Sequence, residues 1–145
     1  MSEKLNGKPP TSYYMVAGAF LVWNLIGLTF YYLQVTMTPE AMAASLTLEQ
    51  AAFMNNEPTW ATAAYAIAVN AGVIGALLLL FRKSLARPLF ILSFIAVLLQ
   101  DLNAFVLNDA IEVWGTSGLY LPAVVIVICA SEIWYSSSVA NPHYR

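Results

Sequence analysis

Four long apolar runs constrain the fold of this chain more than any other feature of its sequence. A helix needs about 20 predominantly apolar residues to cross the hydrocarbon core of a bilayer. Of the 145 residues, 60% are hydrophobic and 10% are charged, whereas a soluble domain carries about 25% charged residues. The sequence therefore predicts an all-α integral membrane protein. We expect one membrane domain, residues 15–138, folded as a four-helix bundle with spans near residues 15–35, 58–81, 88–107 and 118–138.

Polar segments flank this predicted domain. We expect residues 1–14 and 139–145 to be cytoplasmic tails. The first apolar run could instead be a signal peptide, because small residues at positions 41–43 resemble a cleavage site. We favour an uncleaved span, since this run is longer than the roughly 7–15 apolar residues of a signal peptide.

The long connection between the first two spans carries two helix-start patterns. Thr38-Pro39-Glu40 combines an N-cap residue, a first-turn proline and an acidic side chain at the positive end of a helix dipole. Thr47 and Gln50 match a capping box. We therefore expect short periplasmic helices here rather than a loose loop.

Basic residues are confined to one side of the predicted bundle. With four spans, both tails and the link between spans two and three share a side, and together they contain all six Lys and Arg. The loops of the opposite side carry only acidic charges, namely Glu40, Glu49, Glu57, Asp109 and Glu112. Because basic loops stay in the cytoplasm, we expect both termini there and the protein in the inner membrane of a bacterium.

Aromatic residues flank the predicted spans, as is usual at the two membrane–water interfaces. At the cytoplasmic interface we expect the side chains of Tyr13, Tyr14, Trp134 and Tyr135. At the outer interface we expect Trp60, Trp114 and Tyr120.

Three polar side chains crowd into the third span: Gln100, Asp101 and Asn103. Helical spacing places Gln100 and Asn103 on one stripe with Ser93 and Ala96, and places Asp101 about 100° round from it. Lipid cannot hydrate such a stripe, so we expect it to face other helices or water.

The spans contain two prominent carboxyl groups, Asp101 and Glu132, and no Lys, Arg or His to pair with them. A charge at the bilayer centre costs about 2.5–3.5 kcal/mol on insertion scales. We expect Asp101 to be protonated, to line a wet cavity open toward the periplasm, or to bind a cation. The alternative is contact with outer water, or hydrogen bonding to nearby amides as part of helix packing. Glu132 is a further candidate for the solute site, although we favour a side chain that reaches the cytoplasmic interface, close to the Trp134 ring.

Two amides and two aromatic rings complete the candidate solute site. Asn24 and Asn70 fall near mid-membrane, where they could recognise hydroxyl groups or bond to a neighbouring helix. Trp23 and Tyr65 could stack on a sugar ring, although aromatic side chains at helical spacing more often pack in a core or face lipid.

Small residues recur every four positions in the second span, at Ala64, Ala68 and Gly72. This spacing lets helix backbones approach closely. We expect Ala68 and Gly72 to line a close helix contact.

The sequence lacks the patterns that support catalysis or cofactor chemistry. It has no nucleotide-binding, zinc-protease or serine-hydrolase motif. The one histidine, His143, is near the C-terminus, and Cys129 is the one cysteine, which also speaks against a membrane oxidoreductase subunit. We expect no enzyme activity, no cofactor and no metal site, and the net charge of -2 does not favour nucleic acid.

Several short motifs run along the chain: Trp23-Asn24-Leu25-Ile26-Gly27, Pro58-Thr59-Trp60-Ala61, Ala66-Ile67-Ala68-Val69, Leu77-Leu78-Leu79-Leu80-Phe81-Arg82-Lys83 and Pro88-Leu89-Phe90-Ile91-Leu92-Ser93. This series, ending at Gln100, resembles a family of small bacterial four-span membrane proteins commonly labelled "sugar transporter". The resemblance covers nearly the whole chain, and it implies a four-span fold and a sugar-like solute. Gln100 matches the family's pattern, whereas Asp101 departs from it.

Two hypotheses of function remain open. In the first, the protein binds or transports a small polar solute, with a sugar as one candidate. In the second, it is a non-catalytic accessory or scaffold subunit of a membrane complex, and its polar side chains pack helices together. Both hypotheses have the lipid bilayer as a partner. Under the first we expect a homodimer, because four spans are few for a transport path. Under the second we expect a partner membrane protein.

Overall fold

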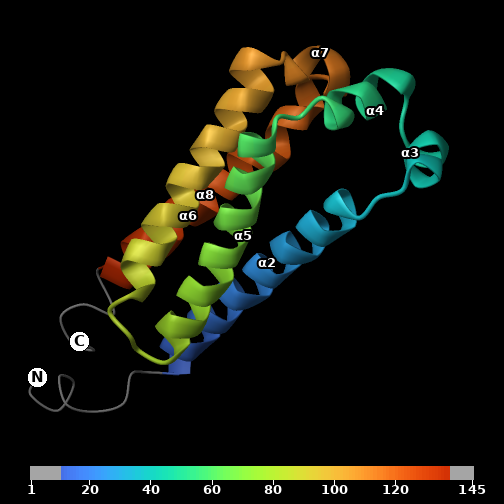
Figure 1. The fold of residues 1–145 in the computed structure, drawn as a ribbon. Coiled ribbons are helices and arrows are strands. Elements are labelled where there is room, and N and C mark those ends of the chain that lie inside the picture. Colours follow the sequence, from blue (N-terminus) through green and yellow to red (C-terminus); the bar gives the residue numbers. More distant parts are fainter. Residues whose placement is uncertain (1–10, 138–145) are drawn as a thin grey trace, which may run out of the picture.

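The computed structural model describes residues 11–137, and every regular element in this range is helical (Figure 1). In chain order the elements are α2 (Thr11–Val35), α3 (Pro39–Ser45), α4 (Leu48–Asn55), α5 (Thr59–Leu80), α6 (Ala86–Asp101), the π-helical η1 (Leu102–Leu107), α7 (Ala110–Trp114), the 3₁₀ turn η2 (Thr116–Leu119) and α8 (Tyr120–Tyr135).

Four helical stretches are long and apolar enough to cross a membrane, which confirms the predicted all-α fold class. They are Thr11–Val35, Thr59–Leu80, Ala86–Leu107 and Thr116–Tyr135. The first begins at Thr11 rather than near residue 15, because its first turn packs into the bundle through Tyr13. The expected end of the fourth span at residue 138 lies outside the described residues, as do residues 1–10 and 139–145 of the two predicted tails.

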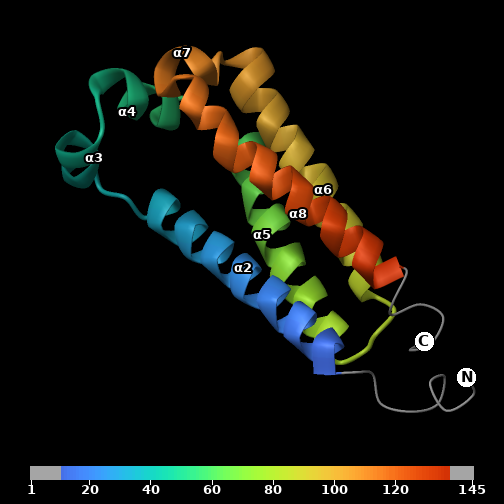
Figure 2. The same cartoon turned by 180° about the vertical axis from the view of Figure 1, so that it is seen from behind.

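The helix α5 lies at the centre of the packing, between α2 and α6, and α6 also packs against α8 (Figures 1 and 2). Glycine lets α5 approach its neighbours, because a Cβ at Gly75 would lie 3.0 Å from two ring carbons of Phe90 on α6. A Cβ at Gly72 would lie 2.0 Å from Oδ1 of Asn24 on α2. Ala68 is buried beside them, so the predicted close contact at Ala68 and Gly72 is confirmed.

All four long helices meet at the end of the bundle where α2 begins and α8 ends. We call this the basic end, because the link between α5 and α6 carries Arg82 and Lys83 here. The link starts with a Schellman-type ending of α5, in which the amides of Arg82 and Lys83 donate to the carbonyls of Leu79 and Leu78. Arg82 takes the positive φ of 60° that this ending requires.

Tyr13 is fully buried at the basic end, and its hydroxyl donates to the carbonyl of Leu79 on α5. Its ring faces the other helices rather than lipid, and its place at the cytoplasmic interface stays a prediction. The ring packs with Ala17, Ala76 and Phe90 in a core where α2, α5 and α6 meet, whereas Tyr14 beside it is exposed.

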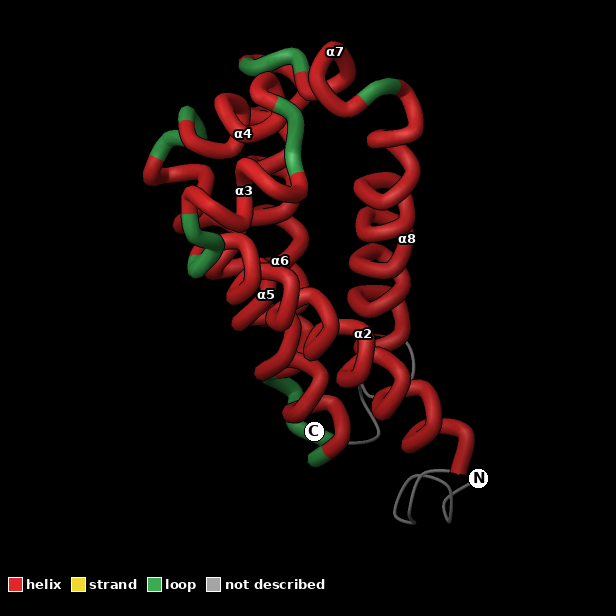
Figure 3. The backbone as a smooth tube through the Cα atoms, turned by 90° about the vertical axis from the view of Figure 1, so that its right-hand side faces the viewer, coloured by secondary structure: helices red, strands yellow, loops and turns green. Residues whose placement is uncertain are grey.

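The opposite end of the bundle carries the predicted short helices, and we call it the acidic end because Glu40 and Glu49 lie in their first turns. Oγ1 of Thr38 accepts from the amide of Ala41, and Thr47 forms the reciprocal capping box. The helix α4 packs against α7, which lies at the same end in Figure 3. The helices expected between spans one and two are thus confirmed.

Candidate functional site

A hydrogen bond between buried side chains joins α2 and α8 in the bundle interior. Nδ2 of Asn24 donates to Oε2 of Glu132 at 2.5 Å and to the carbonyl of Phe20 at 2.8 Å. Asn24 is 7% exposed and Glu132 is 1% exposed. Because α2 and α8 are not among the closely packed helix pairs, this bond joins two helices that diverge toward the acidic end in the view of Figure 3.

The position of Glu132 corrects one sequence-based expectation. Its side chain does not reach the interface, because it points into the bundle and meets the amide of Asn24. The aromatic ring expected to mark the interface beside it, that of Trp134, is 65% exposed and faces outward. For Asn24, the hydrogen bond to a neighbouring helix is the alternative that the structure bears out.

Two further helices complete the surroundings of this pair. Gly72 on α5 lies against the Asn24 amide, and a Cβ at this glycine would also come within 3.5 Å of Oγ of Ser93 on α6. Oγ of Ser93 itself donates to the carbonyl of Ala68 at 2.7 Å. We call Asn24, Gly72, Ser93 and Glu132 the inner polar node, to which each of the four long helices contributes one residue.

A second group of polar residues lies where α6 becomes π-helical, and we call Gln100, Asp101 and Asn103 the outer polar turn. Single π-helical turns are frequent at functional sites, because they re-aim side chains within a long helix. Asn103 is 4% exposed. Its backbone carbonyl oxygen and its side-chain Oδ1 accept hydrogen bonds from Nδ2 of Asn108, at 2.8 and 2.9 Å respectively. Its burial confirms that this stripe faces the bundle.

Asp101 turns one carboxyl oxygen inward. The residue is half-buried, and its Oδ2 is the one buried carboxyl oxygen without a hydrogen-bond partner within residues 11–137. Buried polar atoms are nearly always hydrogen-bonded, so an unsatisfied one calls for a physical explanation. Gln100, next to it, is also half-buried.

Cys129 on α8 lies three positions before Glu132 and packs with Ala68, Ala96 and Val97. Ala96 and Val97 belong to α6, which ends at Asp101 and packs against α8. We call this contact between α6 and α8 the interior seam, and the two carboxyl groups belong to the two helices that form it.

The other candidate residues do not join these groups. Asn70 is exposed on α5, and its amide donates to the carbonyl of Ala66 in the same helix at 2.7 Å. Tyr65 is half-buried and packs edge-on against Tyr31, with ring centroids 5.1 Å apart. Trp23 is half-buried on α2, and a stacking role for these rings stays a prediction.

The sequence did not predict which side chains of different helices would be in contact. Ser93 was placed on the polar stripe and Gly72 in the small-residue pattern, but their meeting with Asn24 depends on how three helices cross. One sequence signal could have predicted this contact: a small residue at position 72 and the amide of Asn24 at a similar depth on another span.

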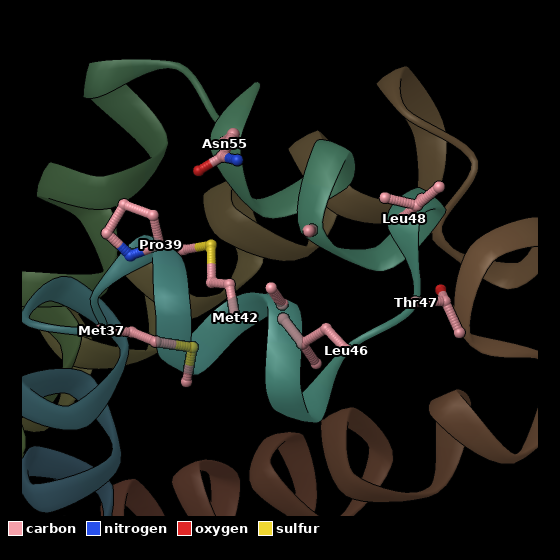
Figure 4. A pocket seen from close by; sticks show the side chains of 9 residues that line it. Met37, Pro39, Met42, Leu46, Thr47, Leu48 and Asn55 are labelled. Carbon is pink, nitrogen blue, oxygen red and sulfur yellow. The ribbon is translucent and has the colours of Figure 1, made fainter.

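A pocket of about 330 Å³ lies at the acidic end, away from both polar groups (Figure 4). It is mostly apolar and is formed by α3, α4 and the chain around them: Met37, Pro39, Met42, Ala43, Leu46, Thr47, Leu48, Ala51 and Asn55. No lining residue is charged, so this pocket does not supply the polar cavity expected beside Asp101, which remains a prediction. Among the described residues no cluster of His, Cys, Asp or Glu could hold a metal ion.

No family model matches this chain, and neither a curated protein nor a solved structure matches it significantly. The inner polar node and the outer polar turn are therefore the features from which function is inferred.

Proposed function

We propose that this protein is a multi-pass membrane protein of the bacterial inner membrane that binds or moves a small polar solute, with a sugar as the leading candidate class. In this proposal both termini are cytoplasmic, and the solute enters from the acidic end. The protein performs no chemical reaction.

The observation that carries the proposal is the unsatisfied inward-facing oxygen of Asp101. No described residue donates a hydrogen bond to this oxygen. A hydroxyl group of a solute would supply that donor. Gln100, the preceding residue on α6, is also half-buried, and its amide offers both a donor and an acceptor. A molecule with several hydroxyls could bond to both side chains.

Asn24 and Glu132 would close the inner end of the same seam. Asn24 is the last buried residue of α2, after Tyr13 and Ala17. Toward the acidic end α2 leans away from α8 (Figure 3). Opening the hydrogen bond between Asn24 and Glu132 would be the step that lets the solute pass, or lets Glu132 exchange a proton.

A specific observation also favours the second candidate function, an accessory or scaffold subunit. Asn24 and Ser93 both use their side chains for hydrogen bonds to another helix of the bundle. Interhelical bonds of this kind are worth about 0.6 kcal/mol on average in membrane proteins. Under this hypothesis Asp101 would have no solute to bind, and its replacement would leave function unchanged.

A ligand panel separates the two candidates. The purified protein in mild detergent is heated with monosaccharides, polyols and small ammonium compounds, each at millimolar concentration. The proposal expects at least one hydroxyl-rich compound to raise the melting temperature of the wild type but not of Asp101→Leu. Glu112→Leu, which changes an exposed acid on α7 at the same end, is the matched control. A panel without any stabilising compound favours the scaffold function.

A further inference from the structure

The outward face of α5 carries one polar side chain among apolar ones. Its exposed positions after the first turn are Ala63, Ile67, Asn70, Ile74 and Leu77, and we call them the α5 stripe. The neighbours Ile67 and Ile74 are 45% and 48% exposed, so the surroundings of Asn70 are apolar.

Asn70 lies at the middle of its span. It is 11 residues after Thr59 (70 − 59) and 10 residues before Leu80 (80 − 70). At 1.5 Å per residue, either end of the helix is about 15 Å away. Neither lipid headgroups nor interfacial water reach this depth, and acyl chains offer no hydrogen bond.

The side-chain amide of Asn70 uses only part of its hydrogen-bonding capacity within the bundle. Its one hydrogen bond within residues 11–137 is the local bond from Nδ2 to the carbonyl of Ala66. The second N–H and both lone pairs of Oδ1 remain available. Because an exposed amide at mid-membrane needs a partner, the α5 stripe is suited to contact another helix.

We propose that the α5 stripe is the contact between two copies of this chain, with Asn70 of one copy hydrogen-bonded to Asn70 of the other. An amide is self-complementary, since it carries a donor and an acceptor on one group. A two-fold interface places the same residue of both copies together.

The charge distribution sets the direction of this contact. Arg82 and Lys83 lie at one end of the bundle, and Glu40 and Glu49 lie at the other. Both copies therefore insert the same way round, and the two-fold axis is normal to the membrane. The two α5 helices run parallel, and Asn70 meets its counterpart at their crossing point.

The spacing of the α5 stripe fits such a pair. Its members follow one another by four, three, four and three positions, which is the seam of a two-stranded coiled coil. A single polar residue in such a seam fixes register and copy number. Asn70 would therefore exclude sliding of the two helices and larger assemblies.

Disulfide crosslinking in lipid vesicles tests the geometry. In a Cys129→Ala background, Ile67→Cys and Ile74→Cys should each crosslink to the same position of the second copy under mild oxidation. Ile95→Cys on α6, which is 51% exposed, is the matched control and should stay uncrosslinked. A crosslink between positions 67 and 74 that exceeds both self-crosslinks would mean antiparallel helices and would overturn the proposal.

Dilution in bilayers tests the role of Asn70. Asn70→Leu should weaken dimerisation about 3- to 20-fold, the range that corresponds to interhelical hydrogen bonds in membrane proteins, while Ile95→Leu on α6, outside the α5 stripe, should leave it unchanged. The melting temperature of each variant shows that it still folds. A wild-type protein that stays monomeric at every lipid ratio, or an Asn70→Leu dimer as tight as the wild type, overturns the proposal.

Discussion

The side-chain amide of Asn24 on α2 donates a hydrogen bond to the carboxyl group of Glu132 on α8, across 108 positions of sequence. Both residues are buried. The bond joins the first and last helices of the bundle at the depth where they begin to separate. Loss of this hydrogen bond should therefore lower the stability of the whole fold.

We expect Asn24→Leu to destabilise the protein by about 1–3 kcal/mol, because it leaves a buried carboxyl group without its donor. Glu132→Gln should cost less, since its amide oxygen still accepts from Asn24. Unfolding in detergent–denaturant mixtures measures both changes. Thr29→Val on α2, which removes only a local exposed bond to Leu25, serves as the control.

A double-mutant cycle with Asn24→Leu and Glu132→Leu isolates the pair. Contacting residues commonly show coupling energies of 0.5–3 kcal/mol, or roughly 1 kcal/mol here. Additive losses would mean that the two side chains do not interact in the folded protein.

Gly72→Ala should destabilise the protein by about 1–3 kcal/mol, the usual cost of overpacking. The added methyl would lie 2.0 Å from Oδ1 of Asn24, so the amide could not keep its place. Gly18→Ala on α2 is the matched control, because a Cβ there meets nothing within 4 Å. Equal melting temperatures of the two variants would contradict the close contact at the inner polar node.

Tyr13→Phe tests the basic end of the bundle. It removes the hydroxyl that donates to the carbonyl of Leu79 but leaves the buried ring in place. We expect a loss of about 0.5–1.5 kcal/mol, the net value of a buried hydrogen bond. Tyr14→Phe, at a neighbouring exposed position, should change the melting temperature little, and an equal loss in both variants would argue against the role of the Leu79 bond.

Orientation in the membrane is a prediction from charge alone. Fusions to the C-terminus should be active with a cytoplasmic reporter and inactive with a periplasmic one, because the described basic residues Arg82, Lys83 and Arg87 lie at the end of the bundle where α8 ends. Moving basic residues into the loop before α5, as in a Glu57→Lys and Asn56→Lys pair, should weaken this preference. A periplasmic reporter that is active at the wild-type C-terminus would reverse the assignment of the two ends.

The spans and their caps were readable from the sequence because they depend on local signals. Apolar length marks each span, and Thr47 with Gln50 marks the start of α4. The contacts between side chains of different helices could not be predicted from the sequence. Glu132 lies close to the end of α8, where a side chain usually reaches water, and only the approach of α2 buries it. Asp101 was singled out, but the π-helical geometry that follows it has no recognised local signature in the sequence.

The most direct test of the proposed function is uptake into vesicles that contain the purified protein. Labelled glucose, galactose, mannose and xylose are offered at several external pH values to the wild type, Asp101→Asn and the control Asp109→Asn. We predict that the wild type and Asp109→Asn take up at least one sugar in a pH-dependent way. Asp101→Asn should fold normally but lose that pH dependence, together with most of the uptake. Uptake by Asp101→Asn equal to that of the wild type at every pH would contradict the assignment of Asp101 as the solute-binding group.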